Sequence, residues 1–238
     1  MAKRLSAEAV AQYRRDGFYF PLPLLSADEA LGYRRKLESY EQQTGGPIAS
    51  NMRHKTHLLF TWANELARHP EWQERLRDES RALGKTEIDF DDLEKLPALG
   101  QVMKETLRRY PPLPVIPRMA TSDFEWGGYR IKKGAMVVAS PIHTHHMPEW
   151  WPEPQRFDPE RFAPGRAEDE RHTHSWVPFG GGAHLCIGYR FAEVQVKSIL
   201  HQMLLRHRWS IPSDYRMPVQ QAPISKPLDG LPVRLERA

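Results

Sequence analysis

The one cysteine of the chain stands between a run of glycines and a stretch with helical periodicity. It lies in the segment Phe179-Gly180-Gly181-Gly182-Ala183-His184-Leu185-Cys186-Ile187-Gly188. Glycines permit positive φ angles and let the backbone approach a flat ligand, and free amides at a helix start stabilise a thiolate. Such a thiolate is a good axial ligand for haem iron. The alternative is a buried, inert residue, which is the common fate of a lone cysteine.

A second pair of residues with possible chemistry is Glu105 and Arg108. They are three positions apart in a stretch with helical apolar spacing, so their side chains meet on one helix face. By itself this spacing favours an ordinary solvated ion pair, which contributes only a few tenths of a kcal/mol.

The elements that must position these residues follow from helix and turn signals. We expect helices from Ser6 to Gly17, from Ser26 to Gly45, from Pro70 to Gly84 and from Pro97 to the residues before Pro111. Turn signals at Gly127-Gly128 and Lys132-Lys133-Gly134, between Phe124 and Ala139, predict a small sheet. The Pro- and Trp-rich stretch from Pro141 to Pro164 predicts an irregular meander. A last helix is expected from Ile187 to His207, with one apolar side formed by Phe191, Val194, Ile199, Leu200, Met203 and Leu204.

The segment around Cys186 resembles the haem-binding signature of the cytochrome P-450 family. The resemblance rests on a Phe followed by Gly, a basic residue two positions before the Cys and a Gly two positions after it. It implies that Cys186 is the proximal ligand of the iron of haem b. It also implies that His184 binds a haem propionate and that Phe179, Gly182 and Gly188 shape the loop. Histidine replaces the commoner arginine, so this propionate contact is expected to depend on pH.

The same resemblance gives the other candidates their roles. The family has a Glu-x-x-Arg pair joined by an arginine from a Pro-Glu-Arg-Phe segment, which implies a structural network of Glu105, Arg108 and Arg161. Arg118 resembles the family's other propionate-binding arginine, although an exposed arginine at a strand end is an equal alternative. Leu113, Pro114 and Val115 match a stretch that lines the substrate pocket in the family, and ordinary apolar loop packing is the alternative for them.

The resemblance to this family extends from about Thr61 to the C-terminus. Complete members are longer and carry an Ala-Gly-x-x-Thr-like string over the distal haem face, which we do not find in this sequence. The expected domains are therefore residues 61–238, a C-terminal haem-binding region, and residues 1–60, an N-terminal fragment. On this basis we expect low or no activity from the chain as written.

Residues 1–60 weakly resemble the start of the phytanoyl-CoA dioxygenase family, in Gly17-Phe18-Tyr19 and in the run from Arg53 to Leu59. That family binds Fe(II) through His-x-Asp or His-x-Glu and a distant His. The one His-x-carboxylate here is His69-Pro70-Glu71, and its proline suits a helix start better than a metal site. The histidines at 143–146 and 172–174 are interpreted as loop residues, because neither group has the helical spacing of metal ligands.

Composition excludes several classes of protein. The chain has 238 residues, 40% of them hydrophobic, and a net charge of +4 without blocks of like charge, so we expect a folded protein and no nucleic-acid partner. No apolar run is long enough for a membrane span, so a cytoplasmic location is expected. One cysteine allows neither an intramolecular disulfide nor a multi-cysteine zinc site.

The sequence thus predicts a mainly α-helical fold with a small β-sheet, the proximal half of a cytochrome P-450 fold behind an unrelated N-terminal fragment. The resemblance implies a haem-thiolate monooxygenase that takes electrons from a ferredoxin or reductase and oxidises an apolar small molecule. Two alternatives stay open. The chain could be a non-catalytic haem-binding or orphan fusion fragment, or a dioxygenase that uses Fe(II) and 2-oxoglutarate, although the expected metal triad is missing.

Overall fold

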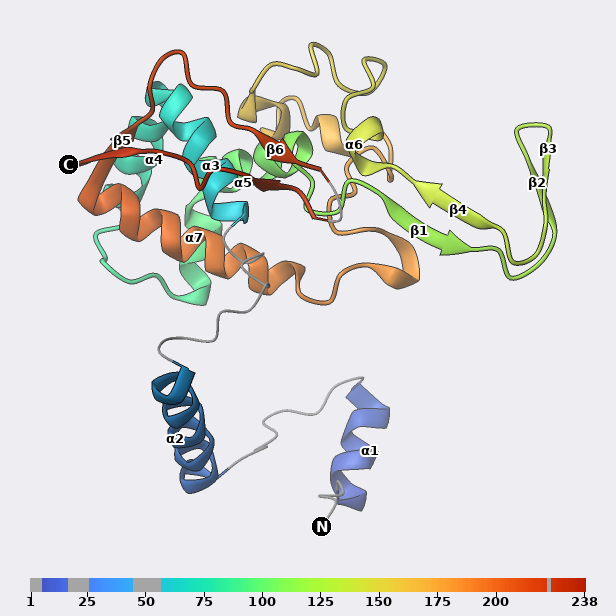
Figure 1. The fold of residues 1–238 in the computed structure, drawn as a ribbon, viewed down its shortest axis with the longest axis horizontal. Helices are drawn as coiled ribbons and strands as arrows, with labels where there is room; N and C mark the ends of the chain where they lie inside the picture. Colours follow the sequence, from blue (N-terminus) through green and yellow to red (C-terminus); the bar gives the residue numbers. More distant parts are fainter. Residues whose placement is uncertain (1–5, 17–25, 45–56, 222–223) are drawn as a thin grey trace. The chain divides into compact units, whose positions relative to one another are not determined.

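A computed structural model of the chain describes residues 6–16, 26–44, 57–221 and 224–238 (Figure 1). Backbone contacts divide the chain into two compact units, residues 1–52 and residues 53–238. Each unit is described by itself below.

The first unit contains two helices, α1 (Ala7–Asp16) and α2 (Ala27–Thr44). Both predicted helices are therefore confirmed, each within a residue or so of its expected ends. Residues 17–19 and 53–56 carry most of the resemblance to the phytanoyl-CoA dioxygenase family, and they lie outside the described residues. That resemblance stays a prediction.

The second unit is built on helices α3 (His57–Arg68), α4 (Pro70–Ala82), α5 (Pro97–Arg109) and α7 (Tyr189–Arg206). Their apolar faces form one core that includes Trp62, Leu66, Leu76, Leu99, Val102, Leu107, Leu200 and Leu204. Proline stands at the first position of α4 and α5, where its missing N–H costs nothing. The next amides of α5, on Ala98 and Leu99, donate to the carboxylate of Glu79 on α4 at 2.8 and 3.0 Å. The sequence signals for these two helices are confirmed.

Helix α7 lies where it was predicted, but its buried side is narrower than the sequence predicted. Phe191 is 66% exposed and Ile199 is 43% exposed, so the expected apolar side is wrong at these two positions. The buried side instead includes Lys197, whose ammonium donates to the backbone oxygen of Leu93 at 2.7 Å. That hydrogen bond and an ion pair with Glu193 at 3.2 Å compensate the burial of the charge.

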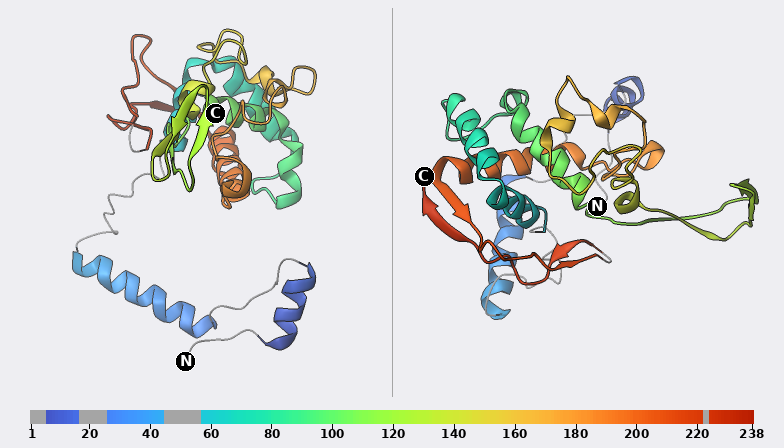
Figure 2. Two further views of the ribbon diagram at one scale, coloured as in Figure 1. Left: turned by 90° about the vertical axis from the view of Figure 1, so that its right-hand side faces the viewer. Right: turned by 90° about the horizontal axis from the view of Figure 1, so that it is seen from above.

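A long two-part hairpin projects from the helical body (Figures 1 and 2). Strand β1 (Ile116–Met119) pairs antiparallel with β4 (Met136–Ala139), and β2 (Phe124–Trp126) pairs with β3 (Tyr129–Ile131). The β2–β3 turn is made by Gly127 and Gly128, both at positive φ. The predicted small sheet is therefore present, as two separate pairs, and β1 lies before the predicted range.

The remaining chain is largely irregular, as the prolines predict. The meander contains the short helix α6 (Pro141–Thr144) and the 3-10 turn η3 (Pro159–Phe162). The 3-10 turns η2 (Phe90–Lys95), η4 (Glu168–Glu170) and η5 (Gly182–His184) lie outside it.

The C-terminal segment adds two more strand pairs that the sequence analysis missed. They are β5 (His207–Ser210) with β8 (Arg234–Arg237), and β6 (Val219–Gln220) with β7 (Lys226–Pro227). The described fold is mainly α-helical with small antiparallel sheets, which confirms the predicted class. None of the helices in the described ranges is long and apolar enough to span a membrane.

Candidate functional site

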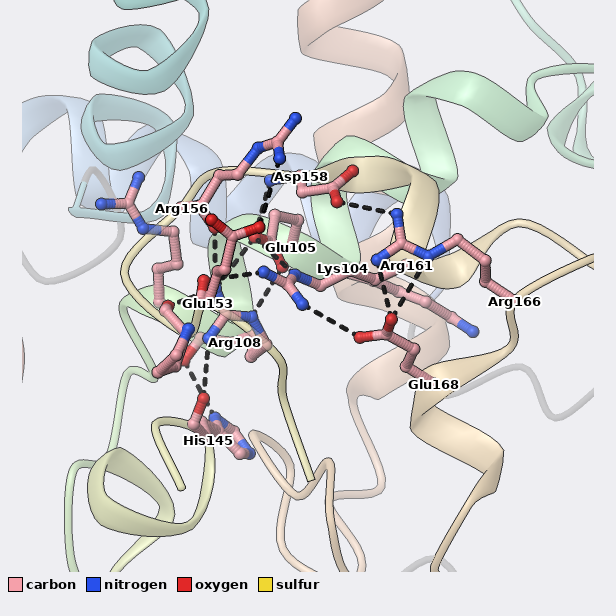
Figure 3. A network of polar contacts seen from close by, with 12 residues as sticks. Lys104, Glu105, Arg108, His145, Glu153, Arg156, Asp158, Arg161, Arg166 and Glu168 are labelled. Atoms are coloured by element: carbon pink, nitrogen blue, oxygen red, sulfur yellow. Dashed lines mark hydrogen bonds and ion pairs between the residues drawn. The ribbon is translucent and has the colours of Figure 1, made fainter. Parts of the chain in front are cut away.

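The second unit holds a buried ion pair between Glu105 and Arg108, one helical turn apart on α5 (Figure 3). The guanidinium of Arg108 donates two hydrogen bonds to the carboxylate, at 2.7 and 2.9 Å, and both side chains are completely buried. The backbone N–H of Asp158 adds a third hydrogen bond to the same carboxylate, at 2.9 Å. Burial raises the pKa of Glu105, while Arg108 and the Asp158 N–H favour its ionised form.

The remaining donors of Arg108 hold the meander. Its Nη1 donates to the backbone oxygen of His145 at 2.7 Å, and its Nη2 donates to that of Pro154 at 2.9 Å. These carbonyls belong to irregular backbone, which has no strand or helix to satisfy them. One helix-borne arginine therefore fixes two separate points of a loop that has no regular hydrogen bonding.

Arg161 lies in the same network, but its principal partner is not Glu105. Its Nε is 3.7 Å from the Glu105 carboxylate, too far for a hydrogen bond, whereas its Nη1 donates to Glu168 at 3.0 Å. Arg166 also donates to Glu168, at 2.7 Å (Figure 3). Arg171 completes an ion pair with the same carboxylate at 3.5 Å, so Glu168 is a buried anion shared by three arginines. Nothing in the sequence pattern marks it, because it lies in a proline-bounded loop without periodicity.

His145 links the network to the segment that leads to the cysteine. Its Nε2 accepts a hydrogen bond from the backbone N–H of Val177 at 2.8 Å, so its Nδ1 carries the proton and donates to the backbone oxygen of Arg108 at 3.1 Å. Burial lowers the pKa of His145 to about 3, because the charged imidazolium would lose its hydration. The interpretation of 143–146 as loop histidines missed this connection.

The loop from Phe179 to Gly188 is shaped by its own backbone. The N–H of Cys186 donates to the backbone oxygen of Phe179 at 2.9 Å, and Gly180 and Gly182 have φ angles of 76° and 62°. Glycine adopts these angles without the steric cost that a Cβ brings. Cys186 is exposed, three residues before α7 begins, so the cysteine is not buried as the alternative interpretation requires.

Side chains around Cys186 face outward. His184, Leu185 and Ile187 are all exposed, the last one completely. The ring of Phe179 packs inward between the rings of Trp176 and Tyr189, at centroid distances of 6.2 and 5.9 Å. The packing of Phe179 anchors the loop to the core, while the apolar side chains of Leu185 and Ile187 stay exposed to solvent.

Strand β1 places Arg118, the second candidate for binding a propionate, beside the glycine run of the loop. Arg118 and Gly182 both line a cavity of about 300 Å³, together with Val177 and His174. Arg118 is exposed and donates to the backbone oxygen of its neighbour Pro117 at 2.9 Å. Leu113 and Val115, just before β1, are exposed as well. The structure therefore places Arg118 beside the glycine run, while Glu105, Arg108 and Arg161 lie in the separate buried network.

Within residues 6–16, 26–44, 57–221 and 224–238, no three His, Cys, Asp or Glu side chains come together as a metal-binding group. A comparison with family models matches residues 58–229 to the family described as Cytochrome P450. The chain belongs to the cytochrome P450 family. Haem is the cofactor that membership of this family implies.

Curated P450 proteins match the same part of the chain. A Mycobacterium tuberculosis protein named as cytochrome P450 136 is 42% identical over 181 residues, 76% of this chain and 37% of its own length. A sterol 14alpha-demethylase of Mycolicibacterium vanbaalenii is 40% identical over 62% of this chain and 33% of its own length. The chain thus spans about a third of the length of these relatives.

A solved P450 structure shares the fold. The retinoic acid bound cyanobacterial CYP120A1 superimposes with a TM-score of 0.73 at 25% identity. The superposition covers 92% of this chain and 60% of the other one. The architecture of helices and small sheets described above is therefore a P450 architecture.

Proposed function

We propose that this chain holds haem b through the thiolate of Cys186 and is a haem-thiolate monooxygenase. The observation that carries the proposal is the exposed Cys186 at the end of a glycine-shaped loop whose Gly182 lines a cavity together with Arg118. A flat ligand can approach this loop closely, because Gly180, Gly181 and Gly182 have no side chains to obstruct it.

The surrounding residues fit the two kinds of surface that a haem presents. Leu185 and Ile187 offer exposed apolar side chains for the porphyrin face and edge. Arg118 and His184 are exposed donors that we assign to the two propionates. Phe179 fixes the loop from the core side, and Gly188 leaves room next to the sulfur, since an added Cβ there would lie 3.8 Å from Sγ.

The proposed reaction follows from the family. When bound, a thiolate-ligated haem supplies dioxygen activation and the insertion of one oxygen atom into an apolar substrate, with electrons from a ferredoxin or reductase. The residues of this chain donate the thiolate, hold the propionates and keep the loop rigid through Phe179 and the His145–Val177 hydrogen bond. We assign these tasks to residues 61–238, and we propose residues 1–60 as a separate N-terminal fragment.

The ligand assignment is tested by the spectrum of the full chain, reconstituted with haem, reduced and exposed to carbon monoxide. We expect the red-shifted band of a thiolate-ligated haem, and we expect Cys186→Ala to lose it. His143→Gln, an exposed histidine in the meander, is the matched control and should keep the band. An unchanged band in Cys186→Ala contradicts the assignment.

The monooxygenase assignment needs a separate measurement. The haem-loaded chain is supplied with reduced nicotinamide, a matched reductase and a panel of apolar substrates, and hydroxylated product is compared with nicotinamide consumed. Product that depends on Cys186 supports a monooxygenase. A thiolate band without any product on the panel supports the alternative of a non-catalytic haem-binding protein.

A further inference from the structure

His174 lines the cavity beside the glycine run, which Arg118 and Gly182 also line. It comes from a separate loop, twelve residues before Cys186 in the sequence. A Cβ added at Gly181 would lie 3.6 Å from its Cδ2 and 3.7 Å from its Nε2, so this edge of the imidazole faces the glycine run. The ring therefore stands next to the loop that we propose as the haem site.

The loop around His174 is held in place by its own hydrogen bonds. The backbone N–H of His174 donates to Nδ1 of His172 at 3.1 Å, and the hydroxyl of Ser175 donates to the backbone oxygen of His172 at 2.8 Å. The ring of His172 also contacts that of Trp150, at a centroid distance of 5.1 Å. A side chain on such a loop loses less conformational entropy when a ligand binds to it.

One ring nitrogen of His174 is engaged and the other is available. Its Nδ1 lies 2.9 Å from the hydroxyl of Thr173, whereas its Nε2 has no hydrogen-bond partner among the residues that the structure describes. When the hydroxyl donates to Nδ1, the proton of a neutral ring is on Nε2. An acceptor in the cavity favours this tautomer, and His174 then offers it an N–H.

Arg118 supplies the charge of the same cavity. Its Nη1 donates to the backbone oxygen of Pro117 at 2.9 Å, and the other N–H groups of its guanidinium have no partner in the described part of the chain. None of the described lining residues is a carboxylate. The side chains of Arg118 and His174 are both exposed, so a ligand can reach them. A cation and an N–H donor without a competing anion favour a carboxylate ligand.

We propose that His174 donates from Nε2 to the same haem propionate that Arg118 binds. This inference rests on the proposed function, because the carboxylate belongs to the haem assigned there. A carboxylate has two oxygens, which can accept from both side chains at the same time. Ile116 and Val177 line the cavity as well and offer apolar surface to the porphyrin edge. His184 does not line it, and it stays assigned to the other propionate.

The haem affinity of the full chain, measured by quenching of tryptophan fluorescence, tests the proposal with two ligands. Haem carries two propionates, whereas haem dimethyl ester has the same porphyrin without their charges. His174→Phe keeps a ring against Gly181 but has no donor. We expect it to bind haem about tenfold more weakly, because a hydrogen bond to a charged group is lost. Its affinity for the dimethyl ester should stay within about twofold of that of the unaltered chain.

Further variants separate a direct contact from a change in the loop. His143→Phe, at an exposed position that does not line the cavity, is the matched control and should bind both ligands normally. His174→Gln keeps an N–H donor and should recover part of the lost haem affinity. His174→Phe should cost less when Arg118→Gln is already present, because both donors act on one carboxylate. The carbon monoxide band should keep its position in all of these variants, since Cys186 is unaltered.

The outcomes separate this inference from the assignment of the iron ligand. A thiolate band together with equal haem affinity in His174→Phe and the unaltered chain overturns the role of His174 and leaves that of Cys186 intact. Equal losses of affinity for haem and for its dimethyl ester also overturn it, because the lost contact is then not with the carboxylate. Absence of haem binding by the unaltered chain overturns both proposals.

Discussion

The buried arginine network around Glu105 and Arg108 and the cysteine loop, residues 179–188, differ in the burial of their functional side chains. In the network, Glu105 and Arg108 are completely buried and form hydrogen bonds with one another and with the backbone of the meander. In the loop, the hydrogen bonds run between backbone groups, and the side chains of Cys186 and Ile187 face outward. The network thus has the properties of a scaffold, whereas the loop has those of a binding surface.

One residue connects the two regions. The ring of His145 accepts a hydrogen bond from the backbone N–H of Val177, which leads to the loop. It donates a hydrogen bond to the backbone oxygen of Arg108, which belongs to the network. Both contacts require a neutral ring with its proton on Nδ1. Substitutions in the network should therefore change stability, those in the loop should change ligand binding, and His145 should make stability depend on pH.

The largest effect is expected from Glu105→Ala. It leaves Arg108 buried without its carboxylate, and the loss of one partner of a buried pair costs about 3 to 5 kcal/mol of unfolding free energy. Urea denaturation measures it. Glu160→Ala, which breaks an exposed ion pair with Arg75, is the control and should cost less than about 1 kcal/mol. Equal, small losses in both variants would show that the network does not hold the fold.

The next effect is the pH dependence that His145 produces. Its pKa falls from 6.5 in the unfolded chain to about 3 in the folded one. Above pH 6.5 the ring is neutral in both states, and the free energy of unfolding is not reduced by its protonation. As the pH falls below 6.5, only the unfolded chain is protonated, so stability decreases until the folded pKa is reached. Between pH 7 and pH 5 this loss is about 2 kcal/mol.

His145→Gln isolates this contribution, because its amide oxygen can accept from Val177 but does not titrate. Its urea midpoint should change less between pH 7 and pH 5 than that of the unaltered chain. His143→Gln, at an exposed position two residues earlier, should keep the full dependence. Identical pH profiles for His145→Gln and the unaltered chain would refute the role of this ring.

A smaller effect is expected from Gly182→Ala in the loop. The φ angle of 62° disfavours any residue with a Cβ, at a cost of about 1 kcal/mol. An added Cβ would meet no atom within 4 Å, so the cost is conformational and not steric. Gly165→Ala is the control, since it too has open space but no positive φ. Thermal unfolding of both variants should separate them, and equal melting temperatures would argue against a strained loop.

The smallest effect on stability is expected from Cys186→Ala. Because the side chain is exposed, its removal should change the unfolding free energy of the haem-free chain by less than about 0.5 kcal/mol. Calorimetric unfolding without haem measures this, and Gly182→Ala on the same loop provides the comparison. A loss as large as that of Glu105→Ala would place the sulfur in the scaffold and remove the distinction between the two regions.

The sequence predicted those parts of the fold and site whose signals are local. Proline at the helix start placed α4 and α5, Gly84 marked the end of α4, and Pro111 marked the end of α5. The spacing of Glu105 and Arg108 brought them onto one face. Local signals do not identify contacts between residues that are distant in the sequence. They could not show that Arg161 bonds Glu168 more closely than Glu105, or that His145 reaches Val177, because an aperiodic meander makes both contacts.

Burial was predicted less well than secondary structure. Phe191 and Ile199 were expected in the core because they are apolar, whereas Lys197 and His201 are buried in it. The polar pair is compensated by backbone oxygens of Leu93 and Lys85, at 2.7 and 3.0 Å. Those partners come from segments about a hundred residues earlier, and no pattern within the helix indicates them.

The strand pair β5–β8 affects the order in which the chain can fold during its synthesis. Trp209 on β5 belongs to the core and donates to the backbone oxygen of Ala63 on α3, and β5 pairs with residues 234–237 at the C-terminus. Helix α3 therefore makes this contact only after 146 further residues have been synthesised. Until then α3 and α4 expose apolar faces, so slowed translation should prolong the binding of chaperones and not help folding.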